Sequence, residues 1–237
     1  MTSVLFVVSA AQGWTLKDGS VHPTGYWADE LATPHRLFRE AGWDISVATP
    51  GGVAPTVDEA SLGVMGGTPA QREKTEQYLS SIQAELGSPR RLEDVDESEY
   101  DLVFYPGGHG PMEDLAYDQT SGLLIARRMA AGAPIAFLCH GPAAVFAAKA
   151  EDGTIAVRGR TMTGFSDAEE KLVPAARKAK WTLESQLKHN GVVYEKAVLP
   201  MRPHVVVDGS LYTGQNPASA QPLAEQLIED LAGVPGR

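Results

Sequence analysis

A short apolar run that ends in the only cysteine of the chain limits the fold most strongly. In PIAFLCHGPAA, residues 134–144, the run 135–138 predicts a strand buried on both faces. Cys139 follows at once, and Pro142 suits the first turn of a helix, where the N–H that proline lacks needs no partner. The stretch therefore predicts a strand, a sharp turn and a helix, which is the local structure of a nucleophile elbow in an α/β protein.

Cys139 has two interpretations. A lone cysteine is most often a small buried hydrophobe. At the start of a helix it is instead a nucleophile when backbone N–H groups and the positive end of the helix dipole favour its thiolate form. The strand end, the adjacent His140 and the following Gly141 favour the functional interpretation. His140 serves as a base only if the turn brings its ring to the sulfur.

Composition excludes several classes of partner. The net charge of −10 and the pI near 5.0 argue against nucleic acids and anionic membranes, which require clustered lysines and arginines. A single cysteine excludes a disulfide framework and a CxxC metal site, and it suits a reducing, cytoplasmic compartment. MTSVLFVVSA lacks a basic segment, so we expect a first strand there rather than a signal peptide. No stretch approaches the roughly 20 apolar residues that span a bilayer.

Strand-like and helix-like segments alternate along the chain. We expect strands at residues 4–8, 45–48, 102–105, 135–138, 196–199, 205–207 and 211–213, and helices at 31–40, 121–131, 143–150 and 218–231. We expect a long loop over 9–26 and strands or a hairpin within 153–163. The continuous apolar runs indicate one α/β domain, 1–237, with a mostly parallel sheet covered by helices on both faces.

The polar segment 66–99 interrupts this alternation. Residues 69–86 predict one or two helices, flanked by Gly67 and Gly87. The segment is too polar for the core, so we expect a small helical cap inserted into the domain.

Three loops open on one edge of the predicted sheet and carry Glu30, Gly108 and Cys139. Ligands of such sheets bind at the carboxyl ends of the strands, where these loops converge. Glu30 is either a favourable charge at a helix N-terminus or an acid that tunes the thiol, and spacing alone favours the first. Gly108 lies in PGGHG, where a backbone N–H turned outward would build an oxyanion hole; an ordinary strand-to-helix loop explains the glycines equally well.

Aromatic residues and a histidine flank these positions. Tyr26 and Trp27 precede Glu30 closely enough to wall the pocket, although packing is the commoner role of such rings. His109 would line the same pocket or lie at the surface. The six histidines show no metal-ligand spacing, so we expect no metal and no other cofactor; they are His22, His35, His109, His140, His189 and His204.

Five motifs resemble the ThiJ/PfpI superfamily, and within it the Hsp31-like branch of chaperones and glutathione-independent glyoxalases. They are TGYWADELATP, YPGGHG, AFLCHGPAA, TGFSDAEE and GQNPASA, and they extend over nearly the whole chain. The resemblance implies a flavodoxin-like three-layer sandwich, similar to class I glutamine amidotransferases, and a homodimer.

The resemblance also implies roles for individual residues. It makes Cys139 the nucleophile, His140 its partner and Glu170 the acidic third member of a triad. It implies that Glu30 is protonated and donates a hydrogen bond to the thiolate. The backbone N–H groups of Gly108 and His140 match the oxyanion donors.

Two segments bear on this assignment. Asp167 and Glu169 lie so close to Glu170 that a one-residue shift would place a different carboxylate on the histidine. Residues 198–204, VLPMRPH, differ from the sequence typical of the branch. The pocket wall that would select the substrate is therefore expected to differ as well.

The implied activity is that of a glyoxalase of the lyase class. It would convert methylglyoxal or a related 2-oxoaldehyde into a 2-hydroxy acid through a Cys139 hemithioacetal, without glutathione or a cofactor. A cysteine amidase or peptidase is an alternative, because a triad and an oxyanion hole serve acyl transfer equally well. A stress chaperone or thiol redox sensor is another; it would need an exposed apolar patch or reversible oxidation of Cys139.

Overall fold

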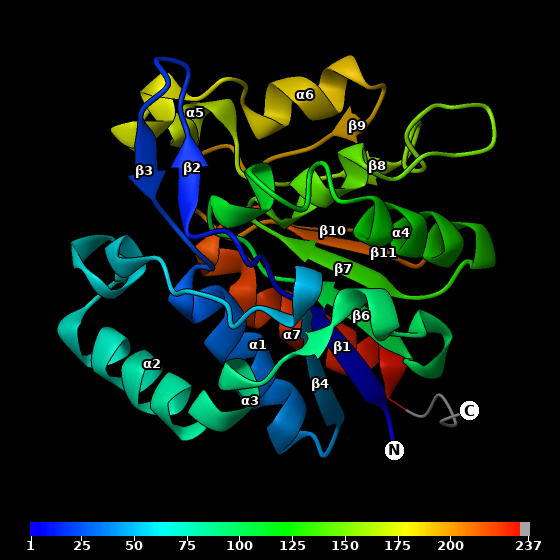
Figure 1. Ribbon diagram of the computed structural model, residues 1–237, viewed down its shortest axis with the longest axis horizontal. Helices are drawn as coiled ribbons and strands as arrows, with labels where there is room; N and C mark the ends of the chain where they lie inside the picture. Colours follow the sequence, from blue (N-terminus) through cyan, green and yellow to red (C-terminus); the bar gives the residue numbers. More distant parts are fainter. Residues whose placement is uncertain (233–237) are drawn as a thin grey trace.

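A seven-stranded sheet lies at the centre of the computed structural model, which describes residues 1–232 (Figure 1). Across the sheet, the strands are β10 (Val205–Asp208), β11 (Leu211–Gly214), β7 (Ile135–Leu138), β6 (Leu102–Tyr105), β1 (Ser3–Val7), β4 (Asp44–Thr49) and β5 (Arg90–Arg91). Within this sheet only β10 and β11 pair antiparallel, so the predicted mostly parallel sheet is confirmed. The last five residues of the predicted domain 1–237 lie outside the described residues.

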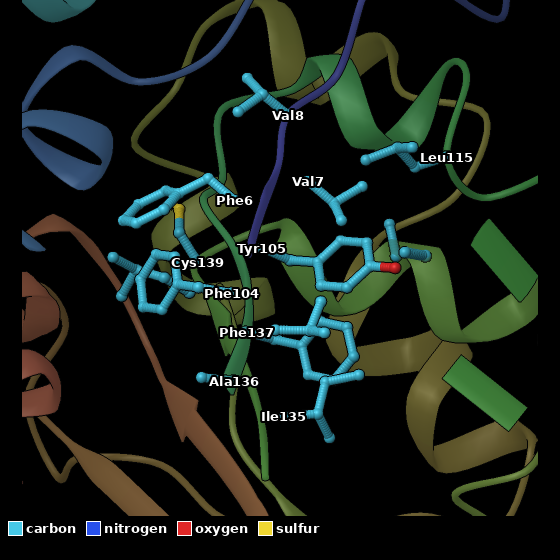
Figure 2. Close-up of a cluster of buried hydrophobic side chains, with 14 of the residues drawn as sticks. Phe6, Val7, Val8, Phe104, Tyr105, Leu115, Ile135, Ala136, Phe137 and Cys139 are labelled. Atoms are coloured by element: carbon cyan, nitrogen blue, oxygen red, sulfur yellow. The ribbon is translucent and has the colours of Figure 1, made fainter. Parts of the chain in front are cut away.

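The central strands are buried on both faces. Every residue of β6 and β7 is buried, as the continuous apolar runs predict. Figure 2 shows side chains of β1, β6 and β7 in this core, with Cys139 beyond Phe137 at the end of β7. The cysteine thus lies where the apolar core meets the carboxyl edge of the sheet.

Helices cover both faces of the sheet, which confirms the three-layer sandwich (Figure 1). The crossover from β1 through α1 (Ala28–Glu40) to β4 runs in the opposite direction to that from β6 through α4 (Gln119–Ala131) to β7. Right-handed crossovers therefore place α1 and α4 on opposite faces. The closing helix α7 (Ala220–Leu231) packs against α1. The strand order reverses between β1 and β6, and a crevice at such a point is the usual ligand site of this architecture.

The helix expected over 143–150 after Cys139 is shorter than predicted. A 3₁₀ helix, η7 (Gly141–Phe146), takes its place, and the chain then turns into an isolated bridge between Lys149 and Ile155. The alanine-rich sequence favours a helix, but α4 packs closely on this segment, and Gly122 of α4 lies directly against Ala147. The expectation of a full helix there was wrong.

The segment 66–99 contains two helices, α2 (Pro69–Ser81) and α3 (Gln83–Gly87). A capping box between Thr68 and Gln71 begins α2, which packs against α1. The end of the segment differs from the expected cap, because Arg90 and Arg91 form β5 at the edge of the main sheet.

Other connections also differ from expectation. The loop expected over 9–26 contains a hairpin of β2 (Gly13–Thr15) and β3 (Val21–Pro23). Of the strands or hairpin expected within 153–163, the described chain has one strand, β8 (Thr161–Met162), which pairs in parallel with β9 (Val193–Tyr194). The strand expected at 196–199 was wrong. Val198 is 99% exposed, and the N–H of Ala197 donates to the side chain of Gln215 rather than to a strand.

The remaining helices are short. They are α5 (Asp167–Glu170), α6 (Leu183–His189) and the 3₁₀ helices η1 (Pro50–Gly52), η2 (Glu59–Leu62), η3 (Val64–Gly66), η4 (Leu92–Asp94), η5 (Glu97–Glu99), η6 (Gly110–Met112), η8 (Ala175–Lys178) and η9 (Pro217–Ser219). Within residues 1–232, no helix combines the length and the apolar character needed to cross a bilayer.

The packing of α4 on the segment after η7 yields a stability prediction. A methyl group added at Gly122 would overlap the carbonyl of Ala147, whereas nothing lies within 4 Å of one added at Gly87. We expect Gly122→Ala to lower the free energy of unfolding by about 1–3 kcal/mol, despite the better helix propensity of alanine. Gly87→Ala should stay within about 1 kcal/mol of the wild type. Urea denaturation of both variants tests this, and equal stabilities would contradict it.

Candidate active site

The backbone of Cys139 is left-handed, with φ at 57°, as in a nucleophile elbow. This conformation costs a residue with a side chain about 1–3 kcal/mol, so neighbouring structure must hold it. The N–H of Cys139 donates to the carbonyl of Gly214 at 2.8 Å, and its carbonyl accepts from Phe165 N–H at 2.9 Å. The predicted sharp turn after β7 is therefore present and is held by β11 and the Phe165 loop.

The turn brings the His140 ring to the sulfur, as a base would require. Nδ1 of His140 lies 3.4 Å from Sγ of Cys139, and its Nε2 lies 2.9 Å from Oε1 of Glu170. All three residues are at most 3% exposed. Thiol, imidazole and carboxylate thus form one buried chain of contacts, the arrangement of a nucleophile, base and orienting acid.

Capping geometry separates Glu170 from its acidic neighbours. Ser166 caps α5, and the Glu169 carboxyl turns back to accept from the Ser166 N–H and hydroxyl. Asp167 accepts from the Ser185 hydroxyl at 2.7 Å. Successive helical residues point about 100° apart. Of the three carboxyl groups, only that of Glu170 reaches the His140 ring.

Glu30 lies beside the sulfur rather than at a solvated helix end. It is 0% exposed, and its Oε2 accepts from the N–H of Gly107 at 3.0 Å. Burial raises the pKa of Glu30 to about 8, so the group is a carboxylic acid at neutral pH. The helix-charge interpretation that spacing favours does not describe this side chain.

The thiol of Cys139 is not held as a ready thiolate. Burial, and then the charge of Glu30 whenever that group is ionised, raise the pKa of Cys139 well above its usual value. The six-residue 3₁₀ helix that follows supplies little of the expected dipole. The resting thiol therefore keeps its proton until a neighbouring base accepts it.

Glu170 has the opposite protonation state to Glu30. Burial opposes its ionisation, but the His140 and His109 rings outweigh burial and lower the pKa of Glu170 to about 2. His109 stacks on the Trp14 ring, with centroids 4.4 Å apart, and its Nε2 lies 3.8 Å from Oε2 of Glu170. Burial and the neighbouring His140 lower the pKa of His109. Glu170 is thus a carboxylate between two imidazole rings.

Two backbone N–H groups, one in the loop after β6 and one at the elbow, match the predicted oxyanion donors. Among residues 1–232, none accepts a hydrogen bond from the N–H of Gly108 or of His140. The φ of Gly108 is 93°, and a side chain there would meet the carbonyl of Gly25. Only glycine permits this close approach.

Tyr26 and Trp27 do not share one role. Tyr26 is 4% exposed, bridges to Val57, and burial raises the pKa of its hydroxyl to about 12. Trp27 lines a groove of about 560 Å³, together with Met201 and residues of α2. None of Cys139, His140 and Glu170 lines this groove, so a role of Trp27 as a wall of the active-site pocket stays a prediction. Tyr26 belongs to the core.

Sequence reasoning missed three residues of this site. Gly107 holds Glu30, Trp14 stacks on His109, and the Phe165 ring lies 4.7 Å from the His140 ring. Phe165 and Gly107 lie inside the motifs TGFSDAEE and YPGGHG, which was the available signal. No sequence motif pointed to Trp14, because this residue belongs to a hairpin that was expected to be a loop.

The chain is similar in sequence and in structure to several known proteins. The chain is 27% identical over 233 residues to a protein of Schizosaccharomyces pombe named glutathione-independent glyoxalase hsp3101, covering 95% of this chain and 94% of the relative. The crystal structure of glyoxalase III from Candida albicans is similar at a TM-score of 0.82 and 25% identity, covering 96% of each chain. The X-ray structure of the Francisella tularensis Rapid Encystment Protein 24 kDa gives a TM-score of 0.85 at 27% identity, covering 98% and 99%.

The family profile matches most of the chain. It covers residues 24–230, from the loop before α1 almost to the end of α7, and so includes β6, the elbow and α5. The resemblance inferred from the five motifs is thereby confirmed, and the chain belongs to the DJ-1/PfpI family.

Proposed function

We propose that this protein is a glutathione-independent glyoxalase of the lyase class, which converts methylglyoxal or a related 2-oxoaldehyde into a 2-hydroxy acid. One observation carries the proposal: the Cys139 sulfur lies 3.4 Å from a His140 ring whose other nitrogen binds the buried Glu170 carboxylate. The names of the S. pombe and C. albicans relatives support the same chemistry.

The reaction begins with addition of the thiol to the aldehyde. The Cys139 sulfur bonds to C1, and the proton of the thiol passes through His140 to the carbonyl oxygen, giving a hemithioacetal. The N–H groups of Gly108 and His140 stabilise negative charge on that oxygen. Ionised Glu170 orients the ring and stabilises the imidazolium while it holds the proton.

Proton transfer from C1 to C2 completes the isomerisation. His140 removes the C1 proton, an enediolate forms, and protonation at C2 leaves a 2-hydroxy thioester on Cys139. Water then cleaves the C–S bond, which releases the 2-hydroxy acid and restores the thiol. The net reaction is methylglyoxal plus water to lactate.

Glu30 keeps the region beside the sulfur from carrying two negative charges. As a carboxylic acid it donates a hydrogen bond to the sulfur when the thiolate forms, and accepts one from Gly107. An ionised Glu30 would instead repel the thiolate. The neutral acid therefore supports nucleophilic attack.

The proposal also covers the domain extent, the assembly state and the location of the protein. We expect a single domain over residues 1–237, a homodimer in solution and a cytoplasmic location. Light scattering on the purified chain tests the assembly state against the monomer mass of 25.3 kDa.

Lactate formation without glutathione tests the central proposal. We expect the wild type to form lactate from methylglyoxal and Cys139→Ala to form none above the uncatalysed rate, because no other thiol is present in the chain. Equal lactate from both proteins would remove Cys139 from the mechanism. No lactate from either would refute the glyoxalase and direct attention to amide and ester substrates.

A pair of carboxyl variants tests the role of Glu170. Glu170→Gln should lower kcat by about 100-fold or more in a chain that still folds, because a neutral amide orients His140 without stabilising the imidazolium. Asp167→Asn, three residues away and bound to Ser185, should keep nearly full activity. Wild-type turnover by Glu170→Gln would remove the triad from the account.

Stability as a function of pH tests the protonated state of Glu30. In the folded chain its pKa is about 8 against the usual 4.5, so the folded state holds a proton that the unfolded state releases between these values. Stability should therefore fall as pH rises from 5 to 8, by about 3 kcal/mol more in the wild type than in Glu30→Gln. Urea denaturation at both pH values measures this difference. Glu59→Gln, at an exposed carboxyl, should follow the wild type; parallel behaviour of Glu30→Gln would contradict a buried acid.

A further inference from the structure

Two imidazoles and a carboxylate meet on the side of the His140 ring that faces away from the sulfur. His109, His140 and Glu170 each offer one ligand atom, and these atoms lie within 4.8 Å of one another. The residues come from three different segments: the loop after β6, the elbow and α5. Their separation in sequence explains why histidine spacing predicted no metal site.

Two polar atoms in this cluster lack a partner. Nε2 of His109 and Oε2 of Glu170 are buried and have no hydrogen-bond partner among residues 1–232. They face one another at 3.8 Å, which is too long for a hydrogen bond. Both residues are more than nine-tenths buried, where polar atoms are normally satisfied. The fold thus leaves a histidine nitrogen and a carboxylate oxygen facing one another without a hydrogen bond.

We propose that His109, His140 and Glu170 form a binding site for a divalent transition-metal ion of the Zn²⁺ type. Two imidazole nitrogens and one carboxylate oxygen are a common ligand set for such ions. Ligands at about 2.0–2.2 Å from a tetrahedral ion lie roughly 3.3–3.5 Å from one another, so the observed separations need only small side-chain rotations.

Packing holds the rings in place for this role. The Trp14 ring stacks on His109 at an interplanar angle of 16°, and Phe165 packs against His140 at 4.7 Å. The two histidine rings contact each other, with centroids 4.3 Å apart. Packing therefore orders two of the three ligand side chains, His109 and His140, before an ion binds.

A bound ion would stop His140 from acting as a base. Coordination of Nε2 moves its proton to Nδ1, the nitrogen that lies 3.4 Å from the Cys139 sulfur. Nδ1 then donates to the sulfur and no longer accepts its proton. The ion also takes the Glu170 carboxylate that orients the ring. The site is thus a reversible inhibitory site for any reaction that starts from the thiol, whatever the substrate.

Cobalt(II) chloride is the probe that tests the site without an activity assay. We expect Cys139→Ala to bind one equivalent of Co²⁺ with visible d–d absorption and no sulfur-to-metal charge-transfer band. Affinity should fall by about tenfold or more in His109→Asn on this background. His189→Asn, at an exposed histidine, is the matched control and should bind Co²⁺ as tightly as the parent.

A fluorescence measurement keeps the proposal testable if the His109 variant fails to fold. Bound Co²⁺ should quench Trp14, because that ring stacks on a ligand, and Trp14→Phe should remove most of the quenching while binding persists. Loss of binding in Cys139→Ala would place the ion on the sulfur and overturn the proposal. Unchanged affinity in a folded His109→Asn would do the same, as would absence of binding by every variant.

Discussion

The left-handed backbone of Cys139 is the constraint on which the site depends. The strained residue persists because β11 accepts its N–H and the loop at Phe165 donates to its carbonyl. Both partners belong to segments far along the chain, so the elbow is complete only when the sheet has closed around β7. The same turn directs the His140 ring between the sulfur and α5. Local strain and global topology are therefore linked at one residue.

Three acidic residues around this turn have separate tasks because their neighbours differ. Glu30 faces apolar core and a single backbone N–H, so it keeps its proton. Glu170 lies between two imidazoles and loses it. Glu169 accepts from Ser166, Gln215, Asn216 and the N–H of Met201, and thereby joins α5 to the end of β11 and to the following loop. Glu30 is the acid, Glu170 orients the base, and Glu169 anchors the loop at Met201.

Much of the fold follows from the sequence, because buried parallel strands require continuous apolar runs, and residues 102–105 and 135–138 are such runs. Segments outside the buried central strands were less predictable from the sequence. Residues 196–199 are apolar enough for a strand, yet the N–H of Ala197 donates to the side chain of Gln215. Placement of Cys139, His140 and Glu170 followed from motifs, whereas the state of the thiol did not. Its pKa depends on burial and on Glu30, which lies 109 positions away and contacts it only through the tertiary structure.

The loop over residues 197–204 is held almost entirely through its main chain. Gln215 accepts from Ala197 N–H, Glu169 from Met201 N–H, Ser219 from His204 N–H, and Asn216 donates to the Arg202 carbonyl. These contacts use main-chain atoms of the loop, and Val198 and Leu199 are exposed to solvent. Met201 is the exception, because its backbone is left-handed, with φ at 60°. The exposed positions of the loop can therefore diverge in sequence during evolution while the anchored backbone stays in place. Val198 and Leu199 are therefore natural positions for inserted or randomised residues, because variation there leaves the chain of thiol, imidazole and carboxylate undisturbed.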